Sequence, residues 1–335
     1  SAIHGRAANS KADITTITSP ENRIESQNAR RTRSSFPAPR FWPRIGPTAP
    51  DSAKMMPKAT GVSRPAIAMP ATASTPANRL WALGLQDEAT EVYERAYKQA
   101  LAHIPKGFRG QITWGEVDNR PFLRLAHGTL LGLMRRRDKA KGGEAAMALA
   151  KQMLAWCPMD NIGVRFLLGD IALLQGDHQA AMMEYLKGAP NSPAHWYQAA
   201  LIAFREGDCV AACTYLRRGI AANPYIAEGL TGRTVLSEHL YWHASNVHGP
   251  EWAVDYLDSV ESAACDWMPE EIDFVDWVFN ASPVLRERAE MMALHEGMTY
   301  ERDAEKRAPY AQRSLNVINR ITDTLSKKMM RKVKN

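Results

Sequence analysis

The sequence predicts an all-α protein made of stacked antiparallel helix pairs, preceded by a disordered amino-terminal arm. Three observations support this class. The stretch 162–224 contains one helical unit written twice in succession. Elsewhere apolar residues recur at spacings of three and four, as on one face of a helix. The segment that ends at Pro76 instead combines dense proline with scattered apolar residues, a composition that cannot bury a core.

The internal repeat matches position by position. Each copy reads as a helix, a Gly-Asp turn, a second helix and a proline. A glycine at each turn allows a left-handed backbone. The matched positions are Gly169, Ala172, Gly176, Ala181, Tyr185, Gly188 and Pro193 in the first copy, and Ala200, Ala203, Gly207, Ala212, Leu216, Gly219 and Pro224 in the second.

This repeat resembles the tetratricopeptide repeat (TPR), a helix pair of about 34 residues. The similarity to a bacterial TPR-like family covers roughly residues 80–280. The resemblance implies a right-handed superhelical stack, a TPR-like α-solenoid, and a binding scaffold with no assigned enzymatic activity. The segments that carry it are 114–124 (WGEVDNRPFLR), 158–166 (PMDNIGVRF), 203–208 (AFREGD) and 223–233 (NPYIAEGLTGR).

Composition divides the chain into four segments. They are a disordered Pro/Arg-rich arm (1–77), TPR-like helical repeats (78–233), aromatic-rich capping helices (234–281) and a charged helical tail (282–335). Within the arm, residues 1–76 hold 11 lysines and arginines against four acidic residues, so the basic pI belongs to the arm. A solvated tail is favoured there over nucleic-acid stacking at residues 36–44, an organelle transit peptide, or sequence that is not genuinely coding.

Helix boundaries follow from apolar spacing and caps. Residues 87–101 predict a second helix of a repeat, but prolines occupy 60–80, so its first helix is predicted to be missing. Asp118 or Asn119 is expected to cap a helix that Pro121 opens. Further helices are expected at 144–156, near 250–263 and at 270–280. The basic residues after 326 predict a solvated surface helix, with an anchor to a partner or acidic lipid as the alternative.

A partner-binding groove is predicted on the first helix of each pair. Tyr197, Leu201 and Phe204 share one helical stripe, while Trp196 lies about 100° away on the side of the alanines. We therefore expect Trp196 in the core and the stripe open to a partner. The predicted groove residues are Phe166, Asp170, Leu173, Tyr197, Leu201, Phe204 and Arg205.

A second constellation is polar. It would form either a pocket for a carboxylate or phosphate, or a set of braces for the turns between repeats. Bracing is favoured because the five donors of arginine suit backbone carbonyls and aspartates. Its members are Glu116, Asp118, Arg120, Arg124, Asp160, Asn161 and Arg165.

Enzymatic signals are weak. His239 with His243 and Cys209 with Cys213 each share a helix face and together would offer zinc ligands, but the two pairs lie well apart in the sequence, so no metal and no cofactor is expected. No hydrolase, Walker or dinucleotide motif occurs. Four cysteines and the lack of a long apolar segment predict a cytoplasmic protein without a membrane span.

The predicted function is therefore a non-enzymatic protein-protein interaction scaffold whose concave groove holds a protein or peptide segment. Two alternatives stay open. One is a metal-dependent or small-ligand enzyme that uses the region of His239 and His243. The other is nucleic-acid association through the basic arm, which is ranked below a protein partner.

Overall fold

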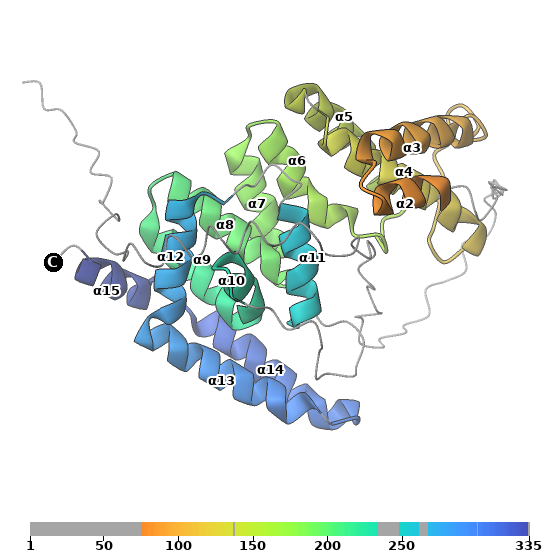
Figure 1. Cartoon of the computed structure of the whole chain (residues 1–335). Helices are drawn as coiled ribbons and strands as arrows, with labels where there is room; N and C mark the ends of the chain where they lie inside the picture. The colour runs from red at the N-terminus through yellow and green to blue at the C-terminus, as the bar shows by residue number, and fades with distance from the viewer. Residues whose placement is uncertain (1–74, 137, 234–247, 261–266, 300, 334–335) are drawn as a thin grey trace, which may run out of the picture.

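The computed structural model describes residues 75–136, 138–233, 248–260, 267–299 and 301–333 (Figure 1). Within these ranges the chain forms fourteen α-helices and two short 3-10 helices, with no β-strand. The prediction of an all-α protein is confirmed. The arm up to residue 74 lies outside the described residues.

Helices α2 to α9 follow one another as hairpins, and each helix packs on its neighbours in the chain. The alternating close contacts extend from α2 to α9, with α8 and α9 forming the most extensive pair. The four hairpins are α2 (Thr75–Ala82) with α3 (Gln86–Leu101), α4 (Arg120–Met134) with α5 (Lys139–Trp156), α6 (Leu168–Leu174) with α7 (His178–Gly188), and α8 (Pro193–Arg205) with α9 (Cys209–Ala222).

The prediction that α3 lacks its first helix is wrong. Helix α2 supplies the missing partner, with Pro76 near its start, where a proline costs no helical hydrogen bond. Ala77 is fully buried against α3, and the hydroxyl of Tyr93 donates a hydrogen bond to Asn78 Oδ1. A proline in the first turn is therefore compatible with this helix.

The turns of the two repeat copies are as predicted. Gly176 and Gly207 have φ angles of 76° and 84°, the left-handed region that glycine tolerates. The aspartate after each glycine caps the next helix: Asp177 accepts from Ala180 N and Asp208 from Ala211 N, both at 2.9 Å. The Gly-Asp dipeptide therefore ends one helix and begins the next.

Helix α5 begins at Lys139, earlier than its predicted start at residue 144. Asp138 caps it by accepting a hydrogen bond from Lys141 N at 3.1 Å. Gly142 and Gly143 lower helix propensity there, which explains why the predicted start of the helix was residue 144. Their small size is used in packing, because a Cβ at Gly142 would lie 2.5 Å from the carbonyl oxygen of Leu133.

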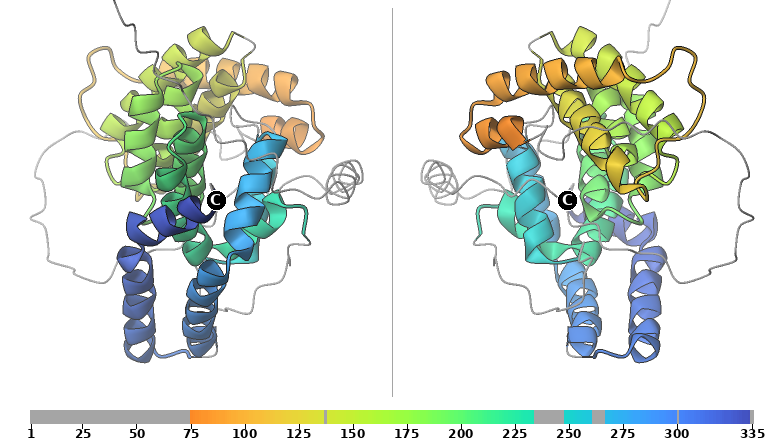
Figure 2. Two further views of the ribbon diagram at one scale, coloured as in Figure 1. Left: turned by 90° about the vertical axis from the view of Figure 1, so that its left-hand side faces the viewer. Right: turned by 90° about the vertical axis from the view of Figure 1, so that its right-hand side faces the viewer.

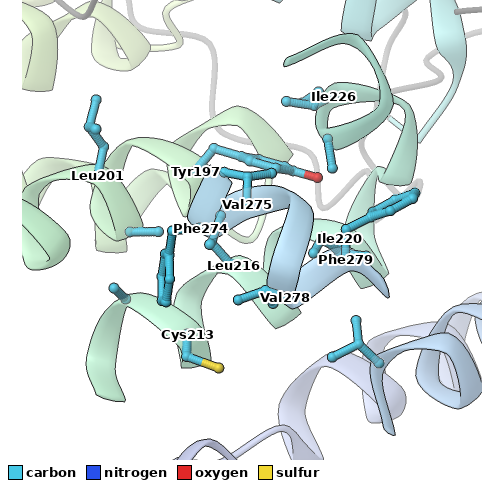
Figure 3. Packing of buried hydrophobic residues seen from close by; sticks show 14 of the residues in the cluster. Tyr197, Leu201, Cys213, Leu216, Ile220, Ile226, Phe274, Val275, Val278 and Phe279 are labelled. Atoms are coloured by element: carbon cyan, nitrogen blue, oxygen red, sulfur yellow. The ribbon is translucent and has the colours of Figure 1, made fainter. Parts of the chain in front are cut away.

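Three further helices follow the hairpins: α10 (Pro224–Leu230), α11 (Pro250–Val260) and α12 (Pro269–Asn280). The existence of helices near 250–263 and 270–280 is confirmed. Helix α12 contributes Phe274, Val275 and Val278 to a buried cluster that includes Tyr197 of α8 and Leu216 of α9 (Figure 3). This cluster joins the second repeat copy to helices that come much later in the chain.

The charged tail forms α13 (Ser282–Thr299), α14 (Ala304–Arg320) and α15 (Asp323–Val333). Helices α13 and α14 lie side by side and extend away from the remainder of the molecule (Figure 2). The basic residues of the last helix are exposed, as expected of a surface helix, but its other side packs on α9 and buries Ser326, Met329 and Met330. Buried Arg217 of α9 holds it, donating to Ser326 Oγ and to the carbonyl oxygen of Thr322, both at 2.9 Å.

Candidate partner-binding surfaces

Helix α8 is buried on nearly every side. Eleven of its thirteen residues are buried, while Phe204 is half-buried and Arg205 is exposed. Trp196 lies in the core as predicted, with its ring stacked on Tyr215 at 6.0 Å between centroids. Tyr197 and Leu201 are also buried, so the prediction that they line an open groove is wrong.

Helix α12 packs on the carboxyl-terminal end of the predicted groove stripe of α8. The rings of Phe204 and Phe274 lie 4.7 Å apart between centroids, close enough for direct aromatic packing. Arg205 binds Glu271 with two hydrogen bonds, of 2.7 Å from Nε and 3.1 Å from Nη2. Such a bidentate pair fixes both position and orientation. The groove residues Phe204 and Arg205 therefore contact a helix of the same chain.

Helix α11 covers the other end of the stripe. Tyr256 of α11 lies 6.4 Å from Tyr197 between ring centroids. Its hydroxyl oxygen accepts hydrogen bonds from Gln198 Nε2 at 2.9 Å and from Trp267 Nε1 at 3.3 Å. Tyr197 directs its own hydroxyl to the carbonyl oxygen of Asn223 at 2.7 Å. The aromatic residues expected to cap the array thus bind the same helix that was expected to bind a partner.

One repeat earlier, the same positions are only half-buried. Phe166, in the 3-10 helix η3 (Val164–Leu167), and Asp170 and Leu173 of α6 retain partial exposure. The Tyr185 hydroxyl donates to Asp170 Oδ1 at 2.5 Å. Burial nevertheless dominates and raises the pKa of Asp170 to about 6. Among the described residues, these α6 positions are therefore less completely covered by other helices than the equivalent positions of α8.

The polar constellation divides into two groups. In the first, Arg120 and Arg124 both place their guanidinium groups over the ring of Trp114, at 5.2 and 5.3 Å from its centroid. Arg120 Nε also donates to the carbonyl oxygen of Trp114 at 3.0 Å. The predicted side-chain cap is absent, since Asn119 donates to the Thr113 carbonyl oxygen instead. The arginines therefore hold the loop before α4 against its first turns.

Asp160 and Arg165 form the second group. The buried Asp160 carboxylate accepts from Val164 N, Arg165 N and Arg165 Nε, each at 2.8 Å. Arg165 Nη2 donates to the carbonyl oxygen of Met159 at 2.7 Å. Asp160 has a φ of 48°, a costly conformation for a residue other than glycine, and these bonds hold it. The geometry is that of a brace for the turn before η3.

The remaining members of the constellation lie at the surface. Glu116, Asp118 and Asn161 are exposed. Close to them in the sequence stand Val117 of the 3-10 helix η2 (Val117–Asn119) and Met159, two apolar side chains with 66% and 76% exposure. Sequence reasoning missed this pair because single apolar residues in loops give no periodic signal.

The zinc alternative finds little support in the described residues. Cys209 and Cys213 lie on α9 as predicted, but burial raises the pKa of the Cys213 thiol to about 11, so the thiolate that zinc requires is disfavoured. His239 and His243 lie outside the described residues. Among the residues that are described, no three histidine, cysteine, aspartate or glutamate side chains gather as a metal site would require.

Comparisons with known proteins assign no family to this chain, because no family model, no curated protein and no solved structure matches it. None of the described helices has both the length and the apolar character needed to cross a lipid bilayer.

Proposed function

We propose that this chain is a non-enzymatic scaffold in which α2 to α9 form a right-handed solenoid of the tetratricopeptide type. One observation supports the binding role above the others. Helix α8 holds α12 through an aromatic contact and a bidentate Arg205–Glu271 pair. A repeat face of this kind can therefore hold an amphipathic helix, which is how helix-in-groove recognition works.

The proposed partner site is the α6 face, formed by Phe166, Asp170 and Leu173. Leu173 stands at the position equivalent to Phe204, which contacts Phe274 of α12, and all three side chains keep partial exposure. The partner is a protein or peptide segment, and the proposed location is the cytoplasm. Cys157, Cys209 and Cys213 carry no disulfide, which fits a reducing compartment.

A matched pair of double variants tests the proposal. Phe166→Ala with Leu173→Ala truncates the α6 face, whereas Met182→Ala with Leu186→Ala truncates equally half-buried residues on α7. We expect the α6 variant to lose about tenfold or more of partner capture from a host extract, because apolar anchors provide most of the binding energy. The α7 variant should keep it, with a similar loss of thermal stability. An α6 variant that folds and captures the same proteins would refute the site.

A further inference from the structure

The carboxyl-terminal helices carry net positive charge, opposite to that of the preceding segment 234–303, which contains three basic and 15 acidic residues. Residues 304–335 contain nine lysines and arginines but two acidic residues. Residues 77–303 contain 22 basic and 30 acidic residues. Outside residues 1–76, net positive charge is thus densest in residues 304–335, which contain α14 and α15.

On α14 the cations form a line. Lys306, Arg313 and Arg320 are exposed and follow one another at intervals of seven residues. Residues seven apart differ by only about 20° around a helix, so the three share a face and span about 21 Å. Gln312 and Asn316 are exposed beside this line and hydrogen-bond to each other at 3.1 Å. Amide and guanidinium donors therefore alternate along α14.

On α15 the cations are held outward by packing. Lys327, Lys328, Arg331 and Lys332 are exposed, while the opposite side of the helix is buried against α9. Because Met329 and Met330 belong to the main buried cluster, the apolar side of α15 is already occupied. The basic residues are therefore presented by a docked helix with a defined outward face.

Most of these cations are not neutralised by the chain itself. Arg320 pairs with Glu290, and Lys327 pairs with Asp323 at 2.5 Å. Lys306, Arg313, Lys328, Arg331 and Lys332 make no ion pair with any residue in the described ranges. A polyanion could consequently bind five cations without first breaking an internal ion pair.

We propose that the exposed cations of α14 and α15, together called the basic face, bind the backbone of double-stranded nucleic acid without sequence preference. Lysine and arginine neutralise phosphates, and amide side chains contact phosphate and sugar oxygens. The line of about 21 Å on α14 matches about six base pairs at 3.4 Å each.

Two other polyanions fit this face less well. Single strands are held largely by stacking on aromatic side chains. Tyr310 is the one aromatic residue in 304–335, and it is half-buried against Gly297. Lipid binding by an amphipathic helix requires an apolar face that can enter the membrane interface. The apolar face of α15 is buried on α9 instead.

The test measures binding of the full chain to a mixed-sequence duplex of about 24 base pairs at several salt concentrations. The basic-face variant carries Arg313→Gln, Lys328→Gln, Arg331→Gln and Lys332→Gln. A control with equal charge loss carries Lys98→Gln, Lys106→Gln, Lys139→Gln and Lys151→Gln, all exposed and on other elements. The arm is present in both proteins, so its contribution cancels.

We expect the basic-face variant to bind at least about tenfold more weakly near 0.1 M salt, with a log–log salt slope shallower by about three. The control should stay within about threefold of the unmodified chain. Lys328→Gln alone, a change at one exposed side chain, should reduce the slope by about one if the quadruple variant fails to fold.

Three results would overturn the inference. The first is no duplex binding by the unmodified chain. The second is an equal loss in the basic-face and control variants, or an unchanged slope for Lys328→Gln. The third is tighter binding of the same face to phosphatidylserine-containing vesicles than to the duplex, which would make it a membrane-binding surface.

Discussion

The two copies of the repeated helical unit have the same local architecture but different surroundings. In α6–α7 the groove positions Phe166, Asp170 and Leu173 keep partial exposure. In α8–α9 the equivalent positions Tyr197 and Leu201 are buried under α11 and α12. The comparison shows that exposure of a repeat face depends on what the rest of the chain places over it, and only partly on the repeat itself.

Side-chain differences between the copies follow from these surroundings. Asp170 and Tyr185 form a hydrogen-bonded pair in the first copy, where Asp170 keeps some contact with water. Their equivalents are Leu201 and Leu216, both members of the fully buried cluster. A carboxylate at position 201 would lose its hydration under α12, so an apolar pair is the more stable choice there.

The largest expected effect comes from truncating the same groove position in each copy. Tyr197→Ala should lower the free energy of unfolding by about 3–5 kcal/mol, because it empties a buried site and breaks the hydrogen bond to Asn223. Phe166→Ala should cost only about 1–2 kcal/mol, because that ring is partly exposed. Urea denaturation of both variants measures the difference. Equal costs would mean that α11 and α12 do not cover α8 in solution.

A smaller loss of stability is expected at Gly169, whose lack of a side chain leaves room for the Tyr185 ring. A Cβ at Gly169 would lie 2.5 Å from the Tyr185 ring, so Gly169→Ala should cost about 1–3 kcal/mol. The second copy has Ala200 and Leu216 at these positions. Tyr185→Leu should therefore relieve the strain of Gly169→Ala, with a coupling energy of about 1 kcal/mol in a double-mutant cycle. Additive effects would show that the ring moves aside freely.

The smallest expected change in the free energy of unfolding comes from the ionisation of Asp170 and depends on pH. The folded pKa of Asp170, about 6, exceeds its ordinary value of 3.8, so the folded state binds this proton more tightly. The stabilisation that this tighter proton binding gives the folded state is complete below about pH 4 and is lost as pH rises through about 6. Asp170→Asn keeps an acceptor for Tyr185 but cannot ionise. The pKa difference sets an upper limit of about 3 kcal/mol on its gain over the unmodified chain at pH 8, which the partial exposure of Asp170 reduces, and the gain should be small near pH 4. A gain that does not change with pH would contradict the burial of this carboxylate.

The local features of the fold were predictable from the sequence. Gly176 and Gly207 identify the turns, because a left-handed backbone followed by a capping aspartate needs those two residue types in that order. Trp196 was placed correctly in the core by helical phase alone. Each of these features depends on residues within a few positions of one another.

Long-range features were not predictable in the same way. The phase of Tyr197 and Leu201 shows that they share a face, but not that α12 covers it. Glu271 and Phe274 carry no motif that connects them to Arg205 and Phe204, which stand far earlier in the sequence. The short α2 was missed because prolines dominate the composition before it.

The contact between α8 and α12 is tested most directly by a charge-swap cycle on Arg205 and Glu271. Arg205→Glu and Glu271→Arg should each destabilise the chain by about 2–4 kcal/mol, because each leaves like charges opposed near a buried site. Together they should recover at least half of the summed loss, as measured by urea denaturation. Strictly additive losses in the cycle would mean that α12 does not lie on α8, and that the predicted groove is open after all.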